Sequence, residues 1–140
     1  MRREVFLSAS FLAVLGVSSV SAQSQEITEL TAETVKGDWR GMRQSDGDLY
    51  PMFLTVSKMS VGTKAARLEI RGPDPCYEDF EFAGNVDGRF VFYPAGGRGC
   101  NFGRDDNRLE IVGSGADTTM RLIDREDGTK RWSITISQED

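Results

Sequence analysis

From residue 37 onward, apolar and polar residues alternate with a period of two, the spacing of β-strands that bury one face. Short clusters of Gly, Pro, Asp and Ser interrupt the alternation, as turns between hairpin strands do. The pattern predicts eight strands: Lys36–Arg43, Leu49–Ser57, Lys64–Arg71, Tyr77–Asn85, Arg89–Tyr93, Arg108–Gly113, Thr118–Asp124 and Thr129–Ser137. Only one long connection is expected, the glycine-rich segment Pro94–Asn107.

The two faces of these strands differ in character, because successive side chains of a strand point to opposite sides. The apolar face collects Trp39, Tyr50, Met52, Leu54, Val56, Leu68, Ile70, Phe80, Phe82, Phe90, Phe92, Leu109, Ile111, Met120, Leu122, Trp132, Ile134 and Ile136. The charged face collects Arg67, Glu69, Arg71, Asp79, Glu81, Arg89, Arg108, Glu110 and Arg121. Across the third and fourth strands, we expect Arg67 and Arg71 to face Asp79 and Glu81.

Eight hairpin-linked strands with one apolar face must bury that face. A single open sheet would leave it bare, whereas a barrel hides it and removes the sheet edges. We therefore predict an all-β fold, an antiparallel eight-stranded meander closed into a small barrel, with a two-sheet sandwich as the alternative. The many inward aromatic rings favour a barrel filled by its own side chains; a ligand-lined cavity is the other reading.

The first 22 residues have the order of a secretory signal peptide, with a basic start, an apolar run and compact residues before a cut after Ala22. The apolar run Val5–Val17 is shorter than a membrane-spanning helix needs. The paired Arg2 and Arg3 leave both ordinary and twin-arginine export open. Gln23, where a lipoprotein would have cysteine, argues against a lipid anchor.

Cleavage would leave an N-terminal arm at 23–35 and a barrel domain at 36–140, in a secreted or periplasmic protein. Removal of two arginines and one glutamate changes the net charge from −5 to −6. Such acidity disfavours nucleic acid as a partner, because phosphates require a basic surface. We expect a monomer without a membrane anchor after cleavage.

Cys76 and Cys100 are the only two cysteines of the chain. In an exported protein an even number of cysteines predicts a disulfide, and two allow a single pairing. Cys76 opens the fourth predicted strand and Cys100 follows the fifth, so the bond would join the open end of one hairpin to the glycine-rich segment.

Histidine is absent from the chain, which removes His-based catalytic triads and the usual histidine zinc sites. A disulfide would leave no thiolate for nucleophilic chemistry. We therefore expect no enzymatic activity, no cofactor and no metal site. A hydrolase that uses paired carboxylates is the remaining enzymatic alternative.

Gly37-Asp38-Trp39 opens the first strand, and Arg131 lies in the last. This arrangement resembles the lipocalin (calycin) pattern, in which Gly-x-Trp on strand one packs under a basic residue of the final strand. The second lipocalin signature, Thr-Asp-Tyr, is absent, and the strands are shorter than usual. The resemblance implies that Gly37, Trp39 and Arg131 close one end of the barrel, and that small apolar ligands bind inside a cup.

The chain is also similar to the small periplasmic barrels that inhibit secreted metalloproteases. The shared features are size, export signal, a single disulfide, an early tryptophan strand and an N-terminal arm, here Gln23–Thr34. That family has its disulfide near the second strand, whereas this chain has Cys76 and Cys100. The resemblance implies inhibition of a secreted hydrolase through the arm, which we retain as an alternative function.

Our leading expectation is a non-enzymatic binding protein that recognises an unidentified protein or small ligand through the 94–107 loop and the barrel mouth. Loops on a rigid scaffold often carry binding residues. The loop combines basic, polar and aromatic side chains, so its candidate binding residues are Arg98, Asn101, Phe102 and Arg104.

Overall fold

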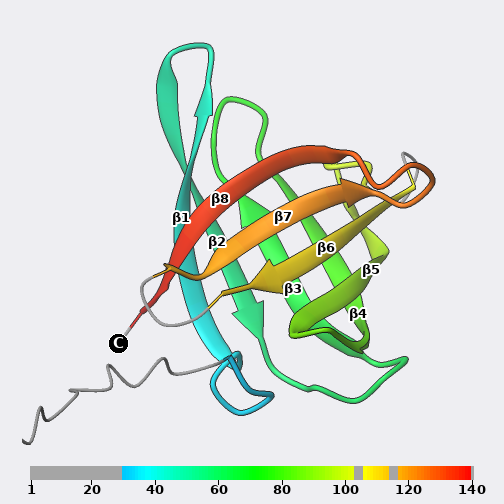
Figure 1. Cartoon of the computed structure of the whole chain (residues 1–140). Coiled ribbons are helices and arrows are strands. Elements are labelled where there is room, and N and C mark those ends of the chain that lie inside the picture. Colours follow the sequence, from blue (N-terminus) through cyan, green and yellow to red (C-terminus); the bar gives the residue numbers. More distant parts are fainter. Residues whose placement is uncertain (1–29, 103–105, 114–116, 140) are drawn as a thin grey trace, which may run out of the picture.

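The computed structural model describes residues 30–102, 106–113 and 117–139 (Figure 1). The predicted signal peptide and the first part of the arm lie outside the described residues. The strands are β1 (Gly37–Ser45), β2 (Asp48–Val56), β3 (Lys64–Ile70), β4 (Cys76–Val86), β5 (Arg89–Arg98), β6 (Asn107–Val112), β7 (Thr119–Asp124) and β8 (Lys130–Gln138). Within the described ranges, no helix is long and apolar enough to cross a membrane.

The eight strands form one closed barrel in chain order, and every neighbouring pair is antiparallel. Figure 1 shows β8 returning to lie beside β1, which completes the closure. The predicted meander and its closure are therefore confirmed, and the sandwich alternative is wrong. The seam between β1 and β8 is short: only Trp39, Arg40 and Gly41 pair with β8 residues, although β1 continues to Ser45.

Strand β5 is longer than the sequence pattern predicts, since it continues through the glycine-rich segment to Arg98. Gly96 and Gly97 pair with Asp79 and Glu78 of β4, and a register shift just before them accommodates the extra residue Ala95. A Cβ at Gly97 would clash with the Tyr77 carbonyl oxygen and the Glu78 carboxyl group. The glycines thus allow close strand pairing, and the first part of the expected loop Pro94–Asn107, as far as Arg98, belongs to β5.

The barrel interior is filled by side chains. Alternation predicted this face well, because most of its apolar residues are buried in one core cluster. At mid-barrel, five side chains have 0% exposed surface, so no water-sized void touches them: Leu68, Phe80, Phe92, Leu109 and Ile111. The aromatic rings serve as core, and no cup surrounds these residues.

One end of the barrel, where β1 begins and β8 ends, is closed by Trp39, Val35 and Gln138. The Trp39 indole N–H donates to the Val35 carbonyl oxygen at 2.8 Å, and both residues are buried. The Gln138 side-chain amide donates to the carbonyl oxygens of Thr34 and Lys36 at 3.2 and 2.8 Å. Gly37 has φ of +124° and leaves room for this amide.

Arg131 does not lie at this end of the barrel, which corrects the barrel-closing role expected of it. Because β8 runs antiparallel to β1, the residue paired with Trp39 is Gln138, and Arg131 lies at the opposite end of β8. There its guanidinium donates to Asn107 Oδ1 at 2.5 Å and to Asp124 Oδ2 at 2.6 Å. Gly37 and Trp39 do lie at the closed end, where glutamine replaces the expected basic residue.

Candidate functional site

The opposite end of the barrel, here called the mouth, gathers the β1–β2 turn, the β3–β4 connection at residues 71–75, residues 99–102 and the β7–β8 turn. Three of the four residues predicted to bind a partner, Arg98, Asn101 and Phe102, belong to this end. The alternating direction of the strands brings these four connections together, although they are far apart in sequence.

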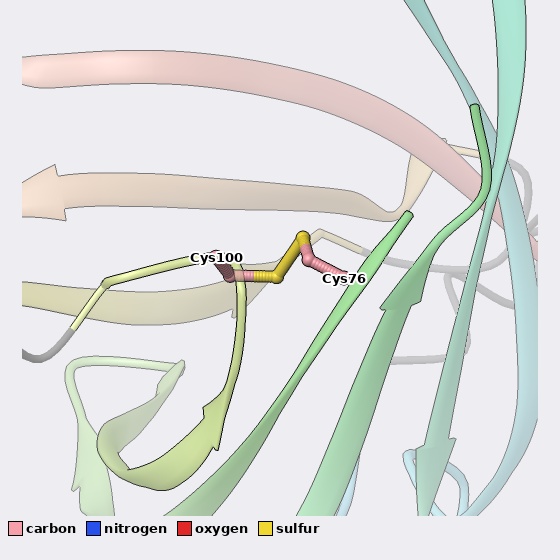
Figure 2. The surroundings of a disulfide bond; sticks show 2 residues. All are labelled: Cys76 and Cys100. Atoms are coloured by element: carbon pink, nitrogen blue, oxygen red, sulfur yellow. A yellow bond between two sulfur atoms is a disulfide. The ribbon is translucent and has the colours of Figure 1, made fainter. Parts of the chain in front are cut away.

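A disulfide joins Cys76 to Cys100 at the mouth, as the sequence predicts (Figure 2). The two Cα atoms are 5.2 Å apart, and the bond links the start of β4 to the segment after β5. In the chain-entropy model, closing a loop of about 25 residues stabilises the fold by roughly 3–3.5 kcal/mol. The bond therefore holds residues 99–102 against the barrel rim.

Phe102 lies inside the mouth and is only 8% exposed. Its ring packs against those of Phe80 and Trp132, with centroid distances of 6.3 and 6.4 Å. The Asn107 backbone N–H and side-chain amide both donate to the Phe102 carbonyl oxygen at 3.2 Å. Phe102 thus plugs the mouth, so a partner at the rim does not meet its ring on the surface.

The other predicted binding residues are distributed differently. Arg98 ends β5 and is exposed, and Asn101 is exposed with φ of +60°. Arg104 lies outside the described residues. The structure therefore leaves Arg98 and Asn101 exposed at the rim and buries Phe102.

Two hollows lie at the mouth ends of β1 to β4. The first has a volume of about 200 Å³ and is lined by Arg43, Tyr50, Ile70 and Asp74, among others. The second has a volume of about 260 Å³ and lies beside Cys76, between Ile70 and Tyr77. The two hollows combine two guanidinium groups, two aromatic rings and two carboxylates at the rim, groups suited to contacts with a polar surface.

Glu78 is a buried carboxyl group that sequence reasoning missed. It lies on the inner face of β4, two residues from the disulfide, and is 4% exposed. Burial raises the pKa of Glu78, although a hydrogen bond from the Gly96 backbone opposes the shift, and the nearby Asp79 charge adds to it. The alternation that places Phe80 and Phe82 inside also places Glu78 inside, so the signal was present in the sequence.

Outside the barrel, β1 to β4 carry two one-to-one ion pairs, Arg67–Asp79 and Arg71–Glu69. Together with the neighbouring outer residues Asp38, Phe53 and Tyr77 they are here called the paired face. Arg67 donates two hydrogen bonds to Asp79, at 2.7 and 3.0 Å, which confirms the predicted cross-strand contact. The Arg67 hydrogen bond holds the pKa of Asp79 below its usual value. Arg71 pairs with Glu69 instead of Glu81, at 3.7 Å, and covers the Phe53 ring.

These geometries offer few groups for covalent chemistry. The two cysteines are bonded to each other, and the chain has no histidine. No group of three or more metal-ligating side chains occurs among the residues that the structure describes. The mouth thus presents polar and aromatic contacts around a rigid plug.

Comparisons with known proteins add no relative: no protein-family model, curated protein or solved structure matches this chain. The lipocalin resemblance therefore rests on the closed eight-stranded barrel and on Gly37 and Trp39, which are compatible with a lipocalin-like barrel without showing the family.

Proposed function

We propose that this protein is an exported, non-enzymatic binding protein that recognises its partner with the rim of the barrel mouth. The observation that carries the proposal is the contrast between a filled interior and a contoured rim. Leu68, Phe80 and Phe92 are completely buried and leave no space for a ligand beside them, whereas two hollows open at the rim, one of them beside Cys76. A partner that binds at the rim does not require a ligand cavity inside the barrel.

Two features support export. The first 22 residues follow the order of a secretory signal, and the Cys76–Cys100 bond is of a kind that persists in oxidising compartments. The disulfide also supports the binding role, because it fixes the rim segment that carries Asn101. A rigid rim loses less conformational entropy when a partner binds.

A photo-crosslinking experiment tests the proposed surface. A benzoylphenylalanine at Arg98 would report on the mouth, and the same residue at Val86 is a matched control, because Val86 is exposed at the other end of the same hairpin. Irradiation in the extracytoplasmic extract of the native host should give a discrete adduct from position 98 and none from position 86.

Adducts from position 86 alone, or from neither position, would contradict the mouth as the binding surface. Native mass spectrometry of the protein from its host supplies a second arm. We expect the mass of the oxidised chain alone, and a stoichiometric small molecule that survives native desalting would show that the barrel carries a ligand.

A further inference from the structure

The outer face of β5 to β7 carries three arginines around one carboxylate, and we call Arg89, Arg108, Glu110 and Arg121 the arginine face. Arg108 Nε donates to Glu110 Oε2 and Arg121 Nη2 donates to Glu110 Oε1, both at 2.7 Å. Arg89 Nη1 lies 3.7 Å from Glu110 Oε2. A single carboxylate thus receives three guanidinium groups from three strands.

Glu110 lies on the outside of the barrel and is nevertheless only 1% exposed. Its neighbours on the same outer face, Val91 and Ile123, are also buried. Long arginine side chains on this face account for the coverage, because their methylene stems shield apolar surface while the charged ends reach water. The guanidinium ends are held by the stems and by Glu110.

The charges of the arginine face do not balance. Three guanidinium groups carry three positive charges, and Glu110 is the only carboxylate within 4 Å of them among the described residues. Burial pushes the pKa of Glu110 up, but the hydrogen bonds and charges of Arg108 and Arg121 outweigh it, so the net shift is downward and Glu110 stays ionised. A local excess of two positive charges therefore remains on an acidic protein.

The donors of the arginine face are also incompletely used. A guanidinium offers five N–H donors, so three of them offer far more than one carboxylate accepts. Arg121 Nε is buried and has no hydrogen-bond partner. The side chains of Arg108, Arg121 and Arg89 remain 24%, 28% and 38% exposed, so their outer N–H groups are accessible.

We propose that the arginine face binds a tetrahedral oxyanion, phosphate or sulfate, either free or as a monoester of a small molecule. A doubly charged oxyanion would neutralise the excess of two charges. Its oxygens accept the paired N–H groups that a guanidinium presents. Glu110 would act as a positioning residue that fixes the guanidinium groups from below, and Arg108 and Arg121 would supply the principal donors. This site lies on the barrel wall and does not depend on the proposed role of the mouth.

The proposal can be tested by titrating the protein with inorganic oxyanions and following its NMR signals. Inorganic phosphate and inorganic sulfate would be added in separate arms at pH 7.5, with ionic strength held constant by chloride. We expect saturable shifts below about 20 mM in the backbone amides of β5 to β7 and in the arginine Nε–H signals. Saturation with only one ion would identify which oxyanion the face prefers.

Substitutions of single arginines test which of them contact the oxyanion. Arg108→Gln and Arg121→Gln should each weaken binding about tenfold, the effect of losing one charge-assisted contact. Arg121→Lys, which keeps the charge and loses the fork, should recover part of that loss. The matched control is Arg67→Gln, on the paired face, which should leave the affinity unchanged.

Two results would overturn the proposal: shifts that do not saturate, or an equal loss of affinity in Arg67→Gln. Backbone amide spectra of each variant without ligand establish that the barrel is intact. If one glutamine variant fails to fold, the other glutamine variant and Arg121→Lys still decide the outcome.

Discussion

The paired face and the arginine face are built from the same alternating pattern on the same barrel, yet they handle charge in opposite ways. On the paired face, Arg67 and Asp79 meet one to one, and the arginine side chain is half exposed. On the arginine face, three guanidinium groups share Glu110, which is almost completely buried.

We expect ion pairs of similar length to differ in their contribution to stability when their burial differs. The Arg67–Asp79 and Arg121–Glu110 contacts are both 2.7 Å. Exposed pairs contribute about 0–1 kcal/mol, because water solvates both partners when they separate. A buried pair whose partner is removed leaves a charge without compensation, which costs about 3–5 kcal/mol. We expect the arginine face to be a structural element as well as a binding surface.

The largest difference between the two faces is expected when the carboxylate of each is truncated to alanine. Glu110→Ala should lower the free energy of unfolding by about 2–3 kcal/mol, because it removes two charge-assisted hydrogen bonds and leaves three partly exposed guanidinium groups without a counter-charge. Asp79→Ala should lower it by about 1 kcal/mol or less. Urea unfolding of both variants measures the two values. Equal losses would show that the two faces are energetically alike.

The pH dependence of the unfolding free energy should also differ between the two faces. The folded pKa of Glu110 is lowered, so its stabilisation is fully present above the unfolded value of 4.5 and is lost as the pH falls through the folded value. Glu110→Gln should therefore flatten the fall in unfolding free energy below pH 4.5. Asp79→Asn is the control and should flatten it less, since Asp79 faces an exposed partner. A steeper fall in Glu110→Gln would contradict the assigned direction.

The alternation of apolar and polar residues was enough to predict the eight strands and their closure, because one continuous apolar face has few ways to be buried. It also predicted the Arg67–Asp79 contact, since cross-strand neighbours follow from register. Burial of Glu110 was not predictable in this way. Alternation places it outside, and its burial arises from the long side chains of three arginines on different strands.

Other errors have local causes. The pairing of Gly96 and Gly97 with β4 escaped prediction, because glycine-rich segments usually indicate loops, whereas here the missing Cβ atoms permit close strand contact. The role assigned to Arg131 came from a family resemblance, and chain direction places Gln138 opposite Trp39. At the mouth, the sequence located the rim segment but could not show that Phe102 turns inward.

Glu78, a carboxyl group inside the barrel, can be compared with Glu110 and Asp79 on the outside. Burial raises the pKa of Glu78, so its protonated form favours the fold and this contribution declines as the pH rises above 4.5 through the folded value. Glu78→Gln should therefore gain stability relative to wild type between pH 4 and pH 7.5, opposite in sign to Glu110→Gln. Thermal unfolding across that range measures the trend. The same sign for both variants would refute the distinction between a lone and a compensated carboxylate.

The smallest expected effect comes from replacing one guanidinium on each face with an apolar chain of similar length. Arg121→Met removes a hydrogen bond to Glu110, but it also removes the buried Nε that has no partner, and Arg108 and Arg89 remain to compensate the carboxylate. We expect a loss of about 1 kcal/mol or less, similar to that of Arg67→Met on the paired face. Urea midpoints of the two variants provide the comparison. A loss of about 3 kcal/mol or more in Arg121→Met alone would mean that all three arginines are needed to hold Glu110, and the excess charge would then be required for folding rather than available to a ligand.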